Sequence, residues 1–302
     1  MSCLIKAEGL SKSYGNKRAL NNINFEINKG APIALVGPNG AGKTTLFSIL
    51  CGYILPTSGN VSIFGQQPAS AQNLSRLAAL PQDAQLDPRF SIAAQLTFYG
   101  QLQGLNKSKA KFEAERVIEL VGLKDSFNEK PGALSHGMRK RATIAQALIG
   151  SPEIVMLDEA TAGLDPLHAR EVRELVATLA DDITFILSSH DLSELERLCE
   201  QVLYLDNGII QQHQTHVSAT KERYLTLRME QNYAELINSL QMIASIRDVV
   251  QSQDREYTIT IESNGEDNPV EIDILTLCYQ QGWRYRQLVN GKTLEEQLFS
   301  KK

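Results

Sequence analysis

The stretch Gly37-Pro38-Asn39-Gly40-Ala41-Gly42-Lys43-Thr44 decides the fold class of this chain. It fits the phosphate-loop pattern GxxxxGK[ST], in which glycines let the backbone turn its N–H groups toward a phosphate. The apolar run PIALV precedes it and the helical pattern KTTLFSILCGY follows it, so a buried strand enters the loop and a helix leaves it. This context predicts a nucleotide-triphosphate site and argues against a glycine-rich turn that matches by chance.

The residues of this loop have distinct physical roles toward a triphosphate. Backbone N–H donors and the positive end of the following helix dipole attract the β- and γ-phosphates. Lys43 adds a positive charge there, and the Thr44 hydroxyl is placed to ligate Mg²⁺. The expected nucleotide-binding residues of the loop are Gly37, Pro38, Asn39, Gly40, Ala41, Gly42, Lys43, Thr44 and Thr45.

Two carboxylates follow another apolar run. The residues IVML, at positions 154–157, deliver Asp158 and Glu159 at the carboxyl end of a strand, which is the edge where open α/β sheets bind ligands. We expect Asp158 to hold the Mg²⁺ shell through water and Glu159 to polarise the water that attacks the γ-phosphorus. An acidic pair that merely favours a helix start is the alternative, which the phosphate loop upstream disfavours.

Short β-branched runs alternate with helical patterns along the first part of the chain. They predict an α/β fold of the P-loop type, with strands at INFEI, PIALV, VSIF, IVML, TFILSS and VLYL. In LHAREVRELVATLA, four apolar residues share one helical face that is expected to pack on the sheet: Val172, Leu175, Val176 and Leu179. Between about residues 87 and 150, the segments SIAAQLTFYGQLQ and KAKFEAERVIELVG predict a helical subdomain inserted into the core.

A hairpin marks the end of the first domain. The dipeptide Asn207-Gly208 joins VLYLD to IIQQHQ and predicts an antiparallel edge on the sheet. A linker follows at about residues 215–221. We divide the chain into an ATPase domain, residues 1–215, and an accessory α+β domain, residues 216–302. The latter reads strand, helix, strand, helix and a short tail: YLTLRM, AELINSLQMIASI, EYTITIES, VEIDILTLCYQQGW and YRQLV.

The composition is that of an ordinary globular protein. The chain has 302 residues, 42% of them apolar and 22% charged, and a net charge of −5 with scattered Lys and Arg, so nucleic acid is not an expected partner. No stretch reaches the roughly 18 apolar residues that span a bilayer, and the N-terminus has no apolar signal core, which predicts a cytoplasmic location.

The cysteines and histidines do not suggest a metal site of their own. The four cysteines are far apart and form no CxxC pair, so they are expected to be reduced thiols: Cys3, Cys51, Cys199 and Cys278. The spacing of His213 and His216 could suit a metal, but no Cys or carboxylate accompanies them, and they are interpreted as polar surface.

A further segment carries a family resemblance. Leu134-Ser135-His136-Gly137-Met138, followed by Arg139-Lys140-Arg141, resembles the LSGGQ signature of ABC transporter ATPases, and the resemblance covers residues 4 to about 212. In that family the segment begins a helix whose N-terminus binds the γ-phosphate held by the opposite subunit. The resemblance gives the hydroxyl role to Ser135 and the backbone approach to Gly137. A serine cap at an ordinary helix start is the structural alternative.

The signature departs from the family at two positions. His136 stands where the family usually has glycine, and Met138 replaces its glutamine. Both belong to the segment that the resemblance places at the interface between the two subunits.

Four more positions match the family pattern, and each has a structural alternative. Tyr14 resembles the aromatic residue that stacks on adenine, although a tyrosine in a strand commonly just packs. Gln82 resembles the glutamine that reaches Mg²⁺ and the attacking water. Asp165 resembles the residue that couples the two nucleotide sites, and it also suits an N-cap. His190 ends TFILSSH, where the family has a histidine that contacts the γ-phosphate.

The end of the chain carries a weaker resemblance. Residues 293–299, TLEEQLF, resemble the C-terminal extension of bacterial ABC exporter ATPases. Trp283 and the apolar helix faces of the accessory domain are interpreted as a small core, with a ligand pocket as the alternative. The resemblance thus implies an exporter ATPase with ATP and Mg²⁺ as cofactors. It also implies a homodimer that joins an integral membrane permease on the cytoplasmic face of the membrane.

Two other functions remain open at this stage. A soluble ABC ATPase of translation or DNA repair usually carries two cassettes or a long coiled coil, and this chain has neither. A regulatory module that binds ATP without turnover is disfavoured by the presence of Glu159 and His190. Measurement of phosphate release distinguishes the regulatory module from an ATPase.

Overall fold

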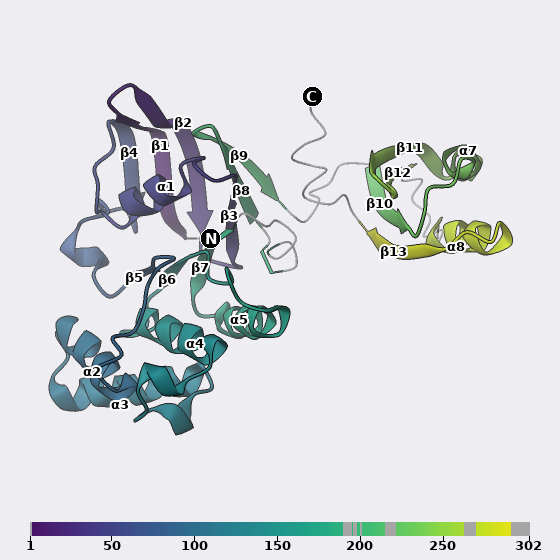
Figure 1. Ribbon diagram of the computed structural model, residues 1–302. Helices are drawn as coiled ribbons and strands as arrows, with labels where there is room; N and C mark the ends of the chain where they lie inside the picture. Colours follow the sequence, from purple (N-terminus) through teal and green to yellow (C-terminus); the bar gives the residue numbers. More distant parts are fainter. Residues whose placement is uncertain are drawn as a thin grey trace. The chain divides into compact units, whose positions relative to one another are not determined.

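The computed structural model describes residues 2–189, 195, 198–199, 201–214, 222–262 and 270–290 (Figure 1). The chain forms two compact units, Met1–Thr215 and His216–Lys302, each with its own hydrophobic core. We call them the N-terminal unit and the C-terminal unit, and each is described by itself.

A six-stranded sheet forms the centre of the N-terminal unit. Its central strands are apolar runs buried along their whole length, as expected where helices cover both faces of a parallel sheet. Five strands are parallel, and a two-residue turn adds β9 antiparallel to β8. The order across the sheet is β5 (Leu77–Leu80), β6 (Ile154–Asp158), β7 (Thr184–Ser189), β3 (Ile33–Val36), β8 (Gln201–Asp206) and β9 (Ile209–Gln214). The predicted α/β class with an antiparallel edge is confirmed.

A separate antiparallel sheet packs over the first helix. It contains β2 (Lys17–Asn28), β1 (Cys3–Tyr14) and β4 (Ser58–Ile63) in that order. Helix α1 (Lys43–Leu50) shares one hydrophobic cluster with this sheet and with β3 and β6 of the central sheet. The helix that leaves the phosphate loop is therefore held between two sheets. The sequence did not predict β1 or β5 as strands, although both exist.

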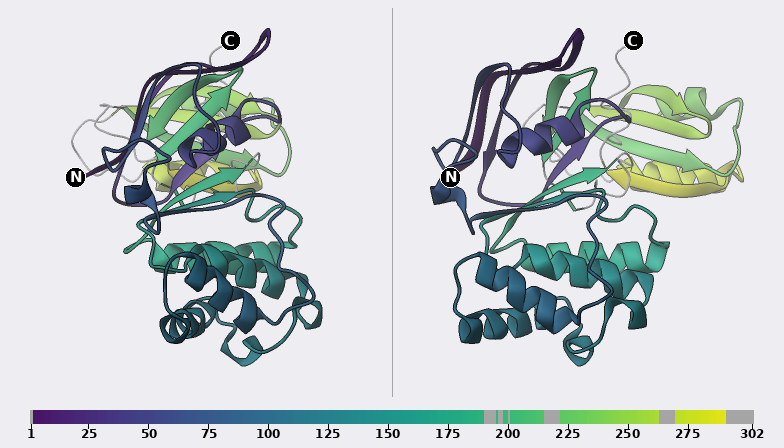
Figure 2. Two further views of the ribbon diagram at one scale, coloured as in Figure 1. Left: turned by 90° about the vertical axis from the view of Figure 1, so that its left-hand side faces the viewer. Right: turned by 60° about the vertical axis from the view of Figure 1, so that its left-hand side comes forward.

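Helices dominate the inserted subdomain, as predicted. Its helices are α2 (Ile92–Leu102), α3 (Lys107–Leu120) and α4 (His136–Ala147), with short 3₁₀ turns at Ala71–Asn73, Lys124–Ser126 and Pro131–Ala133 elsewhere in the connections. Each α-helix begins after a residue whose side-chain oxygen accepts a hydrogen bond from the first turn: Ser91, Asn106 and Ser135. This subdomain and the antiparallel sheet lie at opposite ends of the N-terminal unit (Figures 1 and 2).

Helix α5 (Pro166–Leu179) follows the acidic strand β6. Val172 and Val176 are buried on its inner face together with Ala169, whereas Leu175 and Leu179 are only half-buried. The predicted apolar face is therefore present, but it is narrower than the sequence pattern indicates. None of the helices in the described part of the chain is long and apolar enough to cross a membrane.

The C-terminal unit is a four-stranded antiparallel sheet with two helices. Its elements are β10 (Glu222–Met229), α7 (Leu236–Gln241), β11 (Ile246–Gln253), β12 (Glu256–Glu262), α8 (Val270–Gln280) and β13 (Tyr285–Asn290). The strand order β11-β12-β10-β13 and the βαββαβ sequence of elements define a ferredoxin-like arrangement. Apolar side chains of both helices and of the strands β10, β11 and β12 form one core, and the partly buried Trp283 packs against it.

Two details of this unit correct the sequence prediction. The helix predicted over AELINSLQMIASI ends at Gln241, because Ile246 already begins β11, an edge strand that the sequence analysis missed. The predicted tail YRQLV is the strand β13, which pairs with β10. The missed strand IRDVVQSQ alternates poorly between apolar and polar residues, because as an edge strand it buries only Ile246 and Val249.

Candidate nucleotide site

Three of the predicted site segments meet at one edge of the central sheet. Strands β3, β5, β6 and β7 are parallel and paired in register, so the segments that follow them leave at the same edge. These segments contain the phosphate loop after β3, Gln82 after β5, and Asp158 and Glu159 at the end of β6. His190 follows β7 directly in sequence, but it lies outside the described residues.

The phosphate loop wraps around the side chain of Lys43. The ammonium nitrogen donates to the carbonyl of Gly37 at 2.6 Å and contacts the carbonyl of Pro38 at 3.4 Å, and the side chain is buried. Gly42 has a φ of 113°, and a Cβ there would lie 2.6 Å from the carbonyl oxygen of Ala19, so only glycine fits. The loop therefore holds a buried cation at the N-terminus of α1, where an anion is favoured.

The two carboxylates are buried, and a serine on the neighbouring strand organises them. The hydroxyl of Ser188 donates to Asp158 Oδ1, and the backbone N–H of Glu159 donates to the same hydroxyl oxygen at 2.9 Å. Glu159 adopts a φ of 50°, a left-handed conformation that is uncommon for a non-glycine residue and that turns the chain at the strand end. Sequence reasoning missed Ser188, and its register opposite Asp158 in the parallel pair β6 and β7 is the signal that identifies it.

The donor set at this edge fits Mg²⁺. Thr44 has an exposed hydroxyl-bearing side chain on α1, Gln82 is exposed after β5, and Asp158 supplies a carboxylate. Among the described residues no group of three or more His, Cys, Asp and Glu side chains gathers to hold a metal. Mg²⁺ commonly takes one or two protein oxygens together with nucleotide phosphates and water, so one carboxylate with a hydroxyl and an amide suits Mg-ATP.

Burial shifts the pKa of two further side chains that interact with the charge of Asp158. It raises the pKa of the Cys51 thiol to about 12, and the Asp158 charge adds to this rise, so the thiol stays neutral and unreactive. Burial also lowers the pKa of Lys140, while the charges of Asp158 and Glu159 oppose that change. The two carboxylates therefore favour the protonated form of Lys140.

Tyr14 stands at the end of β1 with half of its surface exposed. The Lys12 ammonium lies 5.2 Å from the centre of the Tyr14 ring and donates to the carbonyl of Leu55 at 2.7 Å. In addition, Ser13 N–H donates to Thr57 Oγ1 at 3.0 Å, which fastens the strand end to the chain that follows α1. The ring is thus held in place while remaining accessible, an arrangement that suits stacking on a base.

The signature segment forms a capped helix start, as predicted. Ser135 is the N-cap of α4, and its side-chain oxygen accepts from the backbone N–H of Met138 at 3.2 Å. His136 is exposed and Gly137 is buried in the first turn. Asp165 caps α5 in the same way, accepting from the backbone N–H groups of Leu167 and His168. The capping alternatives named for Ser135 and Asp165 are therefore both present in the structure.

A hollow of about 390 Å³ separates the Gln82 segment from the start of α4. One wall carries residues 82–86 and the other carries His136, Arg139, Lys140 and Thr143 of α4. Pro131 and Ala162 complete the lining. The hollow therefore lies between the site edge of the sheet and the helical subdomain. Gln82 belongs to the site edge and also lines the hollow.

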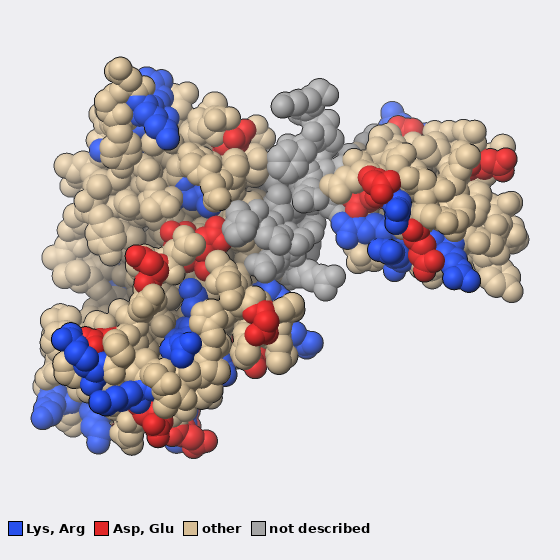
Figure 3. Space-filling model, in the orientation of Figure 1, with Lys and Arg blue, Asp and Glu red and all other residues tan. Residues whose placement is uncertain are grey.

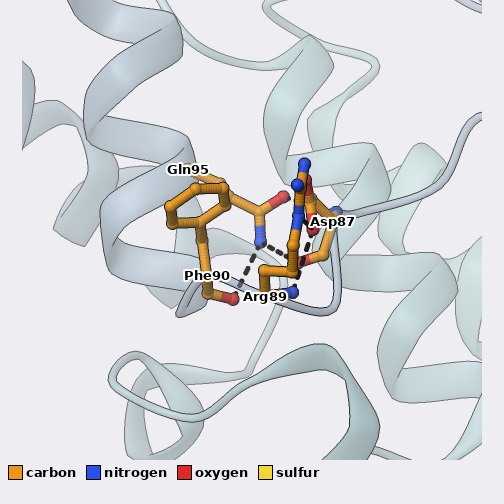
Figure 4. A network of polar contacts seen from close by, with 4 residues as sticks. All are labelled: Asp87, Arg89, Phe90 and Gln95. Carbon is orange, nitrogen blue, oxygen red and sulfur yellow. Dashed lines mark hydrogen bonds and ion pairs between the residues drawn. The ribbon is translucent and has the colours of Figure 1, made fainter.

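A compact turn follows this hollow and leads into α2 (Figure 4). The Gln95 amide accepts from Asp87 N–H at 2.7 Å and donates to the carbonyls of Asp87 and Phe90, while Arg89 pairs with the Asp87 carboxylate at 2.6 Å. The hydrogen bond from Arg89 lowers the pKa of Asp87 to about 2. The turn holds the side chain of Phe90 outward, 52% exposed, whereas Leu86 and Ile92 are buried.

Comparison with known proteins identifies the family. Residues 20–162 match the ABC transporter family model. The chain is 35% identical over 210 residues to the linearmycin resistance ATP-binding protein LnrL of Bacillus subtilis, covering 68% of this chain and 67% of that protein. It is 35% identical to the Nod factor export ATP-binding protein I of a Rhizobium species, covering 68% of each chain. It is 33% identical to the bacitracin transport ATP-binding protein BcrA of Bacillus licheniformis, covering 78% and 79%.

Solved structures agree on the fold. The cbiO1 subunit from Clostridium perfringens has a TM-score of 0.65 at 26% identity, over 71% of this chain and 90% of that one. The dimeric ATP-binding cassette MJ0796 bound to ADP and Pi has a TM-score of 0.63 at 24% identity, over 71% and 100%. The chain belongs to the ABC transporter family, and it is an ATP-hydrolysing subunit of the kind that powers a separate permease.

Proposed function

We propose that this chain hydrolyses Mg-ATP at two composite sites of a homodimer and thereby drives an exporter. The observation that carries the proposal is the convergence of the phosphate loop, Gln82, Asp158 and Glu159 at one sheet edge. In each site, Ser135, Gly137 and Asp165 would come from the other subunit. The dimeric cassette MJ0796 among the structural neighbours supports this arrangement.

In this proposal each residue acts according to its environment. The loop amides and Lys43 bind the phosphates, and Thr44, Gln82 and Asp158 hold Mg²⁺, which supplies charge neutralisation when bound. Ser188 orients Asp158 and fixes the backbone N–H of Glu159. The Glu159 carboxylate then orients the attacking water and accepts its proton, and His190, adjacent in sequence to β7, would steady the γ-phosphate.

Permease binding is assigned to the turn around Phe90 and to helix α2. Phe90 and Phe98 are 52% and 55% exposed, which makes them apolar anchors for a helix of a membrane subunit. This contact would hold the subunit on the cytoplasmic face of the membrane. The names of relatives that act in Nod factor export and linearmycin resistance support export as the direction.

The variant Glu159→Gln tests the catalytic proposal. It keeps the shape of the side chain and removes the carboxylate, so hydrolysis should fall by about 10² to 10⁴ while ATP binding persists. Phosphate release measures the first effect. Size-exclusion chromatography with and without ATP measures the second, because the variant should accumulate as an ATP-bound dimer. Full hydrolytic activity in the variant would remove Glu159 from this role.

Two observations bear on the alternative functions. A regulatory module without turnover does not need a buried carboxylate held at a strained backbone position, as Glu159 is. On the face shown in Figure 3, Lys and Arg side chains are interspersed with Asp and Glu and form no continuous basic band, so that face is unsuited to nucleic acid.

A further inference from the structure

An imidazole fills the space above Gly137 of the signature segment. A Cβ built on Gly137 would lie 2.1 Å from Cδ2 and 2.6 Å from Cγ of His168, far inside van der Waals contact. Gly137 lies in the first turn of α4, and His168 lies in the first turn of α5. The two helix starts therefore touch through one ring, and no residue larger than glycine fits beneath it.

The ring of His168 is held by Asp165. Its Nδ1 lies 2.5 Å from Asp165 Oδ2, and the backbone N–H of His168 donates to Oδ1 of the same carboxylate at 3.1 Å. The hydrogen bond from the His168 side chain lowers the pKa of Asp165, so the carboxylate is charged and Nδ1 carries the proton. The imidazole is thus locked at one edge by Asp165 while its other atoms rest on Gly137.

A second contact joins helices α4 and α5 away from their N-termini. One turn further along, Arg141 of α4 lies 3.6 Å from the carboxylate of Glu171 on α5, and Arg141 also donates to the carbonyl of Val121 at 3.1 Å. The helices α4 and α5 lie side by side in Figures 1 and 2. Glu171 thus offers a matched control, since it joins the same two helices away from their N-termini.

We propose that His168 is a positioning residue. Within one subunit it fixes the signature segment to the segment around Asp165, the residue expected to couple the two nucleotide sites. Gly137 and Asp165 are both expected to face the nucleotide of the partner subunit, so this inference rests on the composite-site proposal above. When the dimer closes, the contact of Gly137 with the partner's phosphate and the contact of Asp165 that couples the two sites must be made together. A ring that sets their spacing lets one subunit present both at once, because small misplacements of such groups are costly.

The experiment uses the full-length Glu159→Gln protein and measures its ATP-dependent dimer dissociation constant by sedimentation. Loss of a hydrogen bond to a charged group is worth about one to two factors of ten, so His168→Ala should weaken the dimer about tenfold or more. The ATP affinity of the monomer should not change. His168→Asn, whose amide can still donate to Asp165, should recover most of the dimer affinity, and Glu171→Gln should change it less than about twofold.

A double variant separates two reasons why position 137 is glycine: the contact with the His168 ring and the approach to the partner's phosphate. Gly137→Ala clashes with the ring and should weaken the dimer strongly. In the His168→Ala background, the same substitution should cost clearly less, because the ring no longer fills the space and only the effect on approach to the partner's phosphate remains. If Gly137→Ala costs the same in both backgrounds, the ring does not set the position of the signature segment, and the positioning role is overturned.

The remaining outcomes are also distinguishable. If His168→Ala leaves the dimer constant unchanged, or if Glu171→Gln weakens it equally, general helix packing replaces the positioning role. If the parent Glu159→Gln protein does not dimerise with ATP, the composite-site proposal itself fails. Melting temperatures without nucleotide confirm that each variant is folded, and His168→Asn against His168→Ala still decides the matter should Gly137→Ala fail to fold.

Discussion

The two units of this chain bury polar side chains in different ways. In the N-terminal unit, Asp158, Glu159 and Ser188 are buried at the ends of the parallel strands β6 and β7, and Lys43 is buried at the start of α1. Among the described residues of the C-terminal unit, the buried charged side chain is Glu256, which lies within a sheet and pairs with Arg228 on the opposite strand. The first group lies at the sheet edge where the nucleotide is expected to bind, whereas Glu256 is paired with its neighbour Arg228.

This difference shows where function is located in the molecule. A buried carboxylate is costly unless it is paired or serves a purpose such as metal binding. At the sheet edge of the N-terminal unit, Asp158 is held by a neutral serine hydroxyl, which leaves its charge available for a cation. In the C-terminal unit Glu256 is neutralised by a guanidinium and has a structural role.

The largest expected effect concerns Lys43. A ligand that binds only the native state stabilises it by about 2.7 kcal/mol at a hundredfold excess over Kd. Mg-ATP should therefore raise the melting temperature of the wild type, and Lys43→Ala should abolish most of this rise because the phosphates lose their buried cation. If the wild-type melting temperature does not respond to Mg-ATP, the phosphate-loop assignment is wrong. Lys111→Ala, on helix α3 and outside the site, should retain the full shift.

A smaller effect is expected for the ion pair of the C-terminal unit. Arg228→Met removes the guanidinium from a carboxylate whose side chain is only 4% exposed, so this unit should lose about 1–3 kcal/mol of stability. Hydrogen exchange of strands β10 and β12 measures the loss. Mg-ATP affinity should be unaffected, and Arg228→Lys should lose less stability. Reduced nucleotide affinity in Arg228→Met would contradict the separation of roles between the two units.

The smallest effect on the isolated protein is expected from its surface aromatics. Phe90→Asn and Phe98→Asn should leave basal ATPase activity within about twofold, since exposed positions tolerate substitution. In cells that express the permease, both variants should detach from the membrane fraction. Phe112→Asn, at an exposed aromatic of α3, is the matched control and should stay bound. A wild-type protein that remains wholly in the cytosol beside its permease would instead favour the soluble-ATPase alternative.

The sequence predicts the N-terminal unit better than the C-terminal unit, for physical reasons. The phosphate loop and the acidic strand need particular residues at fixed spacing, and buried parallel strands read as apolar runs, so these segments could be recognised directly. Strand β5 was missed because LAAL is short and lacks β-branched residues. Strand β11 was missed because an edge strand buries few side chains.

Long-range contacts explain why two further residues could not be identified from the sequence. Ser188 and His168 act through neighbours distant in sequence, Asp158 and Gly137. A single sequence does not show which side chains meet across a sheet or between two helix starts. The predicted roles of Tyr14, Gln82 and His190 stay predictions, because they concern a bound nucleotide.

One measurement tests the central claim that the N-terminal unit holds every residue of the nucleotide chemistry within each subunit. It is the rate of phosphate release from Mg-ATP by a protein truncated to residues 1–215, with the same truncation carrying Glu159→Gln as the control. We expect the truncated protein to fold, to bind ATP and to hydrolyse it within a few-fold of the full-length rate, and we expect the control to hydrolyse ATP about 10² to 10⁴ times more slowly. A folded truncated protein without any nucleotide affinity would contradict the central claim.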